Sequence, residues 1–215
     1  MIISEKNLIK LLLIIPVLFL IAIFTKSIPI IIISILLSIP IIYEIIRRRI
    51  VQPGLRNILT QVVNKFNQHG IKYWVDYGSL LGIIRDKDII KHDYDTDVCL
   101  SPNNPKLEEK LVQIVKELGD PYYLEYHPWS VDTFRIYKKG FLHSPYTDIY
   151  CTKLENGMYV DCSGKIPIEM VGKTQKIMWN GIEISIPEKV HETLVWRYGK
   201  SYMTPIMFKS NENFM

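Results

Sequence analysis

The sequence predicts an α+β domain that follows an apolar N-terminal segment. Between Leu11 and Tyr43 the only charged residue is Lys26, whereas charges are spread over the rest of the chain. Beyond this segment, short runs that alternate like strands are interspersed with runs that have helical spacing. The remaining ~165 residues have the size of one domain. We therefore expect a membrane anchor in residues 1–50 and a single globular domain in residues 51–215.

Two apolar stretches lie in the anchor, Leu8–Phe24 and Ile28–Ile46. Each is close to the ~20 residues that cross a bilayer at ~1.5 Å per residue. One helix over residues 8–46 would be roughly 58 Å long, far more than a ~30 Å hydrocarbon core. The polar residues 25–27, followed by Pro29, therefore predict the turn of a transmembrane helical hairpin. One span plus a partly embedded segment is the alternative.

Charge predicts the orientation of the anchor. The first 50 residues hold six Lys or Arg and two Asp or Glu, and the other residues hold twenty of each. Lys6 and Lys10 lie before and at the start of the first stretch, and Arg47-Arg48-Arg49 follow the second. The positive-inside rule then places both flanks of a hairpin, and the domain, in the cytosol. A single span would leave a luminal enzyme as the alternative. A domain without surplus positive charge argues against nucleic acid as a partner.

The globular part begins with apolar residues at helical spacing, and Gly70 ends this helix. A second helix is expected over 107–118, and a final one from Pro187 to about Tyr198. Asn156-Gly157 predicts a type I′ hairpin turn. Strands are expected at 72–77, 97–100, 133–138, 147–153 and 158–162. The apolar helical positions are Leu55, Ile58, Leu59, Val62, Val63 and Phe66.

Three carboxylates at every second position, Asp93, Asp95 and Asp97, suggest a metal site. If this segment is extended, all three lie on one face. Two carboxylates ~4 Å apart repel by roughly 4 kcal/mol at an effective dielectric near 20. A divalent cation such as Mg²⁺, which prefers oxygen ligands, would relieve this repulsion. A solvated acidic turn is the alternative; an EF-hand is excluded because Val98 and Asn104 occupy its Gly and Glu positions.

A glycine turn precedes the carboxylates. Gly78-Ser79 follows an apolar strand, where backbone N–H groups can face a phosphate. Such a turn alone is common. Placed upstream of alternating aspartates that lead into an apolar strand, it predicts a metal-dependent nucleotide site.

Two blocks and a closing segment of the sequence form a recognisable signature. The blocks are Trp74-x-x-x-Gly78-Ser79-Leu80-Leu81-Gly82-x-x-Arg85 and Ile89-Ile90-x-His92-Asp93-x-Asp95-x-Asp97. The closing segment is Trp179-Asn180-Gly181-Ile182, Ile186-Pro187 and Leu194-x-x-x-Tyr198-Gly199-x-x-Tyr202-x-x-Pro205. Together they resemble the LicD/fukutin family over about residues 55–206. Ser79 stands where Thr is usual in that family, and Lys91-His92 replace the common Pro-Trp.

The resemblance implies a nucleotidyltransferase-like fold of the polymerase-β type, with a mixed sheet and flanking helices. It implies a transferase that moves a phospho-alcohol, such as phosphocholine or ribitol phosphate, from a CDP-activated donor to a glycan or glycolipid acceptor. Gly78 and Ser79 would hold donor phosphates. Asp95 and Asp97 would bind Mg²⁺ or Mn²⁺, with Asp93 as a further ligand or a supporting group.

A third carboxylate is expected from a neighbouring strand. The resemblance favours Asp148, which would orient or deprotonate the acceptor hydroxyl, and Asp161 is the competitor. Arg85, one helical turn beyond Leu81, could reach donor phosphates, or could pair at the surface with Asp86 or Asp88. Arg135 alternates with strand residues and could also face the substrate.

Two other functions fit the same residues. A glycosyltransferase could use Asp95-Thr96-Asp97 to hold the metal of a nucleotide sugar. A catalytically silent membrane adaptor would keep the fold alone, and the retained carboxylates weigh against it.

Overall fold

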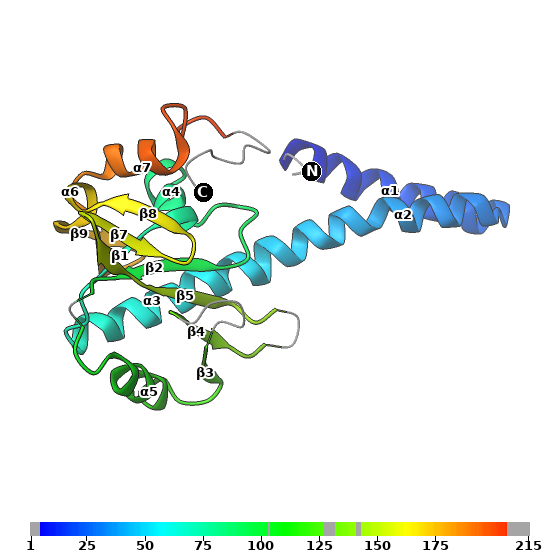
Figure 1. The fold of residues 1–215 in the computed structure, drawn as a ribbon. Coiled ribbons are helices and arrows are strands. Elements are labelled where there is room, and N and C mark those ends of the chain that lie inside the picture. The colour runs from blue at the N-terminus through cyan, green and yellow to red at the C-terminus, as the bar shows by residue number, and fades with distance from the viewer. Residues whose placement is uncertain (1–4, 103, 127–131, 141–142, 206–215) are drawn as a thin grey trace. The chain divides into compact units, whose positions relative to one another are not determined.

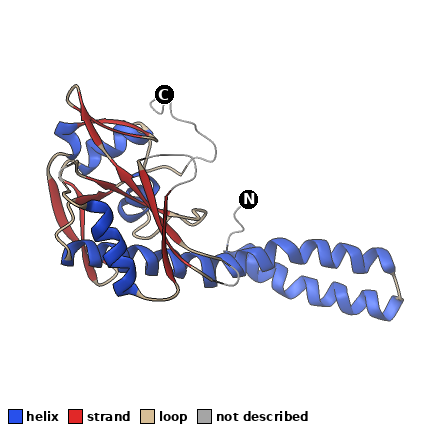
Figure 2. Ribbon diagram, turned by 60° about the horizontal axis from the view of Figure 1, so that its bottom comes forward, coloured by secondary structure: helices blue, strands red, loops and turns tan. Residues whose placement is uncertain are grey.

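The computed structural model describes residues 5–102, 104–126, 132–140 and 143–205. The chain divides into two compact units, Met1–Gln52 and Pro53–Met215. The first unit contains α1 (Glu5–Thr25) and α2 (Ile28–Ile46), followed by a π-helical turn, Arg47–Val51. The two helices lie side by side as an antiparallel hairpin (Figures 1 and 2). Its turn contains Lys26, whose φ of +50° reverses the chain.

Apolar side chains cover the outside of this hairpin. Phe24 is 85% exposed, Ile28 is 69% exposed and Leu13 is 68% exposed. Among the described residues, one helical run, Ile28–Gln68, is long and apolar enough to cross a membrane, and Leu13–Thr25 is a shorter apolar helix.

The second unit is an α+β domain built on a mixed five-stranded sheet, and the predicted fold class is confirmed at this level. The strand order is β1-β2-β5-β4-β3. The pair β2–β5 is parallel, and the other three pairs are antiparallel. The strands are β1 (Tyr73–Val75), β2 (Thr96–Leu100), β3 (Tyr122–Tyr126), β4 (Thr133–Lys138) and β5 (Tyr146–Cys151).

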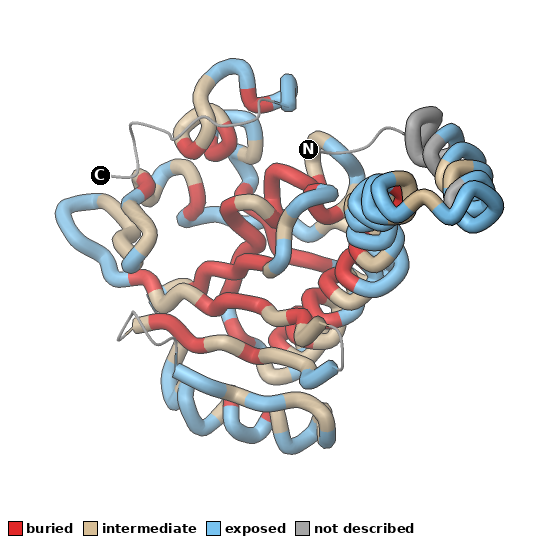
Figure 3. The backbone as a smooth tube through the Cα atoms, turned by 90° about the vertical axis from the view of Figure 1, so that its right-hand side faces the viewer, coloured by how far each residue is buried: buried red, intermediate tan, exposed pale blue. Residues whose placement is uncertain are grey.

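Helices supply much of the core. The apolar stripe predicted in the first helix lies on α3 (Gln52–Gln68), where all six residues are fully buried. Figure 3 shows the buried parts of the chain concentrated in this helix and the central strands. Next to β2 lies α4 (Tyr77–Arg85), and next to β3 lies α5 (Leu107–Leu118), which has the bounds predicted for it.

Two smaller sheets complete the domain. One contains β6 (Lys153–Glu155), β7 (Met158–Asp161) and β8 (Gly164–Pro167); the other pairs β9 (Thr174–Trp179) with β10 (Ile182–Pro187). Short α6 (Ile168–Val171) and α7 (Val190–Tyr198) pack against each other. The turn between β6 and β7 has φ +48° at Asn156 and +75° at Gly157, which confirms the predicted hairpin.

Three predicted boundaries are wrong. Asp93 to Asp97 is not one extended segment, because β2 begins at Thr96 and a turn precedes it. The expected strand over 147–153 is interrupted at Thr152, so that it forms the end of β5 and the start of β6. Pro187 ends β10 and does not open the last helix, which begins at Val190.

Candidate functional site

The start of α4 forms a tight glycine turn. Asp76 caps the helix, because its Oδ1 accepts a hydrogen bond from the Tyr77 N–H at 2.7 Å. Tyr77 adopts a φ of +50°, which is rare for a residue with a side chain. The free N–H groups of a helix N-terminus favour an anion. The predicted Gly78-Ser79 pair therefore lies where a phosphate would be stabilised.

Two of the carboxylates lie close to the backbone of Gly78 in this turn. A Cβ added at Gly78 would lie 2.9 Å from Asp93 Oδ2 and 3.7 Å from Asp97 Oδ2. The absence of a side chain thus leaves room for these carboxylates beside the backbone. Asp93 is not on β2, but the turn before this strand brings its carboxylate close to Gly78, as β2 does for Asp97.

The three aspartates disfavour one another's ionisation. Burial, followed by repulsion from Asp95, raises the pKa of Asp93 to about 7. Burial also raises the pKa of Asp95, with Asp148 as the next cause. Burial and the charges of Asp95 and Asp148 raise the pKa of Asp97 well above its ordinary value. A bound cation would compensate these charges.

Ser79 links the helix to the acidic strand. Its Oγ accepts a hydrogen bond of 2.8 Å from the backbone N–H of Asp97, and the side chain is buried. The hydroxyl therefore holds the start of β2 against α4. The sequence predicts that Ser79 binds the donor phosphates, and it does not predict this contact with β2.

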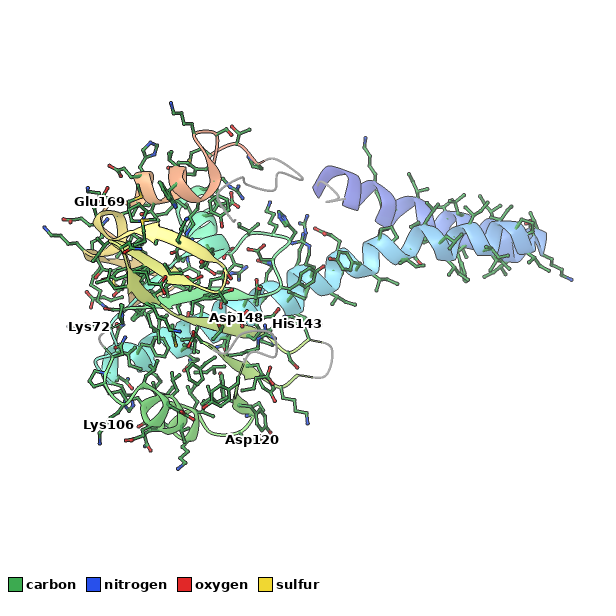
Figure 4. All side chains as sticks on the ribbon, in the orientation of Figure 1. Lys72, Lys106, Asp120, His143, Asp148 and Glu169 are labelled. Atoms are coloured by element: carbon green, nitrogen blue, oxygen red, sulfur yellow. The ribbon has the colours of Figure 1, made fainter. Side chains whose placement is uncertain are left out.

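Asp148 lies next to Asp97 on the neighbouring strand. The two residues pair in the parallel register of β2 and β5 (Figure 4 labels Asp148). Arg135 is opposite Asp148 on β4, and its Nε and Nη2 donate to the Asp148 carboxylate at 2.7 and 3.1 Å. The structure thus brings both predicted residues to the acidic site, but joins them as an ion pair.

The competitor Asp161 has other partners. Its carboxylate accepts from the Tyr77 hydroxyl at 2.8 Å and from the Ser163 and Gly164 N–H groups at 2.8 and 3.1 Å. The first of these bonds ties the Tyr77 side chain to the small sheet that contains Asp161. Asp161 therefore supports the turn, and Asp148 is the carboxylate that adjoins Asp97.

Arg85 pairs with Asp86, which was the predicted alternative to phosphate binding. Its guanidinium donates to both oxygens of Asp86, at 2.9 and 2.8 Å. The hydrogen bond to Asp86 is the main reason that the pKa of Arg85 is raised, and Asp93 adds a smaller effect. Arg85 is thus close enough to the acidic cluster to interact with Asp93 electrostatically.

A buried ion pair under the turn was missed. Arg197 Nη2 donates to Asp76 Oδ2 at 2.8 Å, and the Trp74 indole N–H donates to the same oxygen at 2.9 Å. The Arg197 guanidinium also lies 4.0 Å from the centre of the Tyr77 ring. No local pattern in the sequence identifies Arg197 as the partner of Asp76, because the two residues are 121 positions apart.

The aspartates fit a metal that the substrate helps to hold. Among the described residues, no three His, Cys, Asp or Glu side chains are arranged to hold a metal by themselves. Mg²⁺, however, is usually bound by one or two carboxylates together with substrate phosphates and water. Two mutually repelling carboxylates beside a phosphate-favouring helix start match that requirement.

Comparisons with known proteins give one clear family. A profile of the LicD/FKTN/FKRP nucleotidyltransferase domain matches residues 70–189. No curated protein matches the chain. A crystal structure of ANT(2'')-Ia in complex with adenylyl-2''-tobramycin is 13% identical, with a TM-score of 0.42, over 65% of this chain and 71% of that one. A solution structure of the antibiotic-resistance factor ANT(2'')-Ia is 12% identical, with a TM-score of 0.41, over 65% and 67%. The profile match covers more than half of the sequence and includes every predicted site residue, and the chain belongs to the LicD/FKTN/FKRP family.

Proposed function

We propose that this protein is a membrane-anchored, Mg²⁺-dependent transferase that moves a phospho-alcohol from a CDP-activated donor to a glycan or glycolipid acceptor. Family membership supports transferase activity. The observation that carries the finer proposal is the convergence of Asp93 and Asp97 on the side-chain-free face of Gly78. A diphosphate placed at the start of α4 would lie beside these carboxylates.

Each residue has a specific role in this proposal. Asp95 and Asp97 would hold the metal, which would supply positive charge to neutralise the donor diphosphate, and Asp93 would support them. The N–H groups of Gly78 and Ser79 bind phosphate oxygens. Ser79 also keeps Asp97 in place through its hydroxyl.

The reaction is a substitution at phosphorus. An acceptor hydroxyl oxygen forms a bond to the phosphorus that carries the alcohol, and the bond from that phosphorus to the CMP oxygen breaks. CMP leaves with the bonding electrons. Asp148 receives or directs the hydroxyl proton. Arg135, paired with Asp148, orients that carboxylate before the substrate binds.

A thermal-shift screen tests this proposal. CDP-choline, CDP-ethanolamine, CDP-glycerol and CDP-ribitol are compared with UDP- and GDP-sugars, each with Mg²⁺, with Mn²⁺ and with a chelator. At least one CDP-alcohol should raise the melting temperature in the presence of metal only. A shift with nucleotide sugars alone would identify a glycosyltransferase, and no metal-dependent shift with any nucleotide would indicate a silent adaptor.

The anchor proposal rests on the first unit alone. The hairpin of α1 and α2 exposes apolar side chains, and basic residues flank both of its open ends. We place the hairpin across the bilayer with both ends in the cytosol. In intact cells, Lys26→Cys should react with an impermeant thiol reagent and Arg49→Cys should not. The opposite pattern, or resistance of both, would contradict this orientation.

A further inference from the structure

A row of tyrosines crosses the same face of the sheet as the acidic site. Tyr146 on β5 pairs with Tyr137 on β4, and Tyr137 pairs with Tyr123 on β3. Two residues away from the tyrosine on each strand, Asp148 pairs with Arg135, and Arg135 pairs with Glu125. Residues i and i+2 of a strand share a face. The tyrosine row, defined as Tyr146, Tyr137 and Tyr123, therefore lies beside the carboxylates of the site.

The row begins next to the aspartates and reaches the edge of the sheet. Tyr146 lies two residues before Asp148 on β5, and its backbone carbonyl accepts a hydrogen bond of 3.2 Å from the hydroxyl of Thr96, the residue after Asp95. The Arg135 guanidinium lies 3.9 Å from the centre of the Tyr146 ring. Tyr137 and Tyr123 are stacked, with ring centres 5.3 Å apart. With strands ~4.8 Å apart, the row extends over about 10 Å.

These rings are not needed to fill the core. The opposite face of the same strands supplies the core, with Ile136 and Ile149 fully buried. Tyr123 is 38% exposed, and Tyr137 and Tyr146 are half-buried. Cross-strand aromatic pairs stabilise a sheet by ~1 kcal/mol or less. Three such residues on the face that carries the acidic site suggest a binding role in addition.

The row offers both hydrogen bonds and apolar surface. The Tyr123 hydroxyl donates to Asp120 Oδ1 at 2.9 Å. Within the described ranges, the hydroxyls of Tyr137 and Tyr146 have no hydrogen-bond partner. Tyrosine combines a rigid apolar ring with a polar tip, as binding surfaces require. A ligand on this face would meet ring surface and hydroxyl groups together.

The charges around the row select the kind of ligand. Carboxylates lie at both of its ends: Asp148 is on the same strand and face as Tyr146, and Glu125 and Asp120 lie beside Tyr123. The nearby cation, Arg135, is already paired with Asp148. A phosphate-bearing ligand would be repelled here, whereas carboxylates accept hydrogen bonds from hydroxyl groups. The surroundings therefore favour a neutral ligand rich in hydroxyls.

We infer that the tyrosine row binds the acceptor as a neutral saccharide chain, which approaches the acidic site from the β3 edge of the sheet. This inference rests on the proposed function, because it assigns the acceptor side of the same site. Sugar rings would contact the tyrosine rings through their C–H groups, and their hydroxyls would bond to the tyrosine hydroxyls and to Glu125. The donor occupies the α4 end, where the phosphate site lies.

An array of neutral and anionic oligosaccharides tests the inference. The wild-type protein should bind neutral oligosaccharides, and Tyr123→Ala/Tyr137→Ala should reduce that binding about tenfold or more, since each aromatic contact is worth ~1 kcal/mol. The matched control is Tyr126→Ala. Tyr126 is on the same strand and is 55% exposed, but it pairs with Phe134 on the opposite face. This control should bind like the wild type.

Donor binding is measured in parallel, as the thermal shift caused by CMP with Mg²⁺. All three proteins should show the same shift, which separates this inference from the proposed function. Tyr137→Phe removes only a hydroxyl and provides a second variant if the double substitution lowers the yield of folded protein; it should weaken saccharide binding. Equal saccharide binding by wild type and by the tyrosine row variants, binding of anionic oligosaccharides only, or no saccharide binding by the wild type would overturn the inference.

Discussion

The hydroxyl of Ser79 and the backbone N–H of Asp97 are joined by a hydrogen bond of 2.8 Å. This bond connects the first turn of α4, where a phosphate would be stabilised, to the strand that carries Asp97, the proposed metal ligand. The two proposed halves of the donor site are therefore fixed relative to each other before any substrate binds. Preorganisation of this kind reduces the entropic cost of holding a substrate.

Ser79→Ala should destabilise the domain by about 1–3 kcal/mol, because the buried N–H of Asp97 loses its acceptor. Ser79→Thr keeps the hydroxyl and should cost less. Chemical denaturation of the three proteins measures the difference. Equal losses of stability in Ser79→Ala and Ser79→Thr would indicate that packing, and not the loss of the hydrogen bond, causes the effect.

Asp97→Asn should stabilise the metal-free protein while abolishing its response to Mg²⁺ and nucleotide. The substitution removes one of several repelling, buried charges, which is expected to give ~1 kcal/mol, or about 2–4 °C in melting temperature. Turnover should be lost. The control is Glu169→Gln on α6, which should change neither property. Undiminished turnover of Asp97→Asn would end the metal proposal.

Gly78→Ala should weaken metal-dependent nucleotide binding, because the new Cβ would lie only 2.9 Å from Asp93 Oδ2 and would displace that carboxylate. If this contact is the cause, the effect should be smaller when Asp93 is shortened. A cycle with Asp93→Ser and the double variant measures this coupling by thermal shift. If the effects of the two single substitutions on nucleotide binding simply add in the double variant, Gly78 does not act through its contact with Asp93.

The metal-free domain should become less stable as the pH rises. The pKa of Asp93 is raised to about 7 by burial and by Asp95, whereas an aspartate in an unfolded chain titrates near ~3.9. The folded state therefore binds more protons between these values, and its stability is lost as the pH rises through about 7. With a chelator present, the melting temperature should fall from about pH 5 to about pH 8. Asp93→Asn should show a smaller fall, and an identical profile would contradict the assignment.

Arg197→Gln should cost about 3–5 kcal/mol, because it leaves the carboxylate of Asp76 buried without its guanidinium. Asp76 is fully buried and Arg197 is 3% exposed. Combining Arg197→Gln with Asp76→Asn should recover part of this loss, since no buried charge remains. Denaturation of both variants gives the comparison. A double variant less stable than Arg197→Gln would show that Asp76 acts mainly as the helix cap.

Sequence patterns predicted the elements whose structure depends on residues close together along the chain. The apolar stripe of α3, helix α5 and the Asn156-Gly157 turn follow from local periodicity and backbone preference. The site residues near Gly78 also follow from a short motif. Local spacing failed at Asp93, because a turn rather than an extended strand brings it to the site.

Pairings between distant residues could not be predicted in this way. Arg135 and Asp148 were each expected at the site, but their ion pair depends on the register of β4 and β5. The partner of Asp76 lies 121 positions away, and Asp161 contacts Tyr77 from a separate small sheet. Such contacts depend on how the elements pack, and a single sequence holds no direct record of that packing.

The salt bridge between Arg197 of α7 and Asp76 has a practical consequence for expressing fragments of this domain. Arg197 lies beyond residue 189, where the profile match ends. A fragment cut at that boundary would lose the guanidinium beneath the glycine turn and would be expected to misassemble there. The minimal folding unit of this domain must therefore extend through Tyr198.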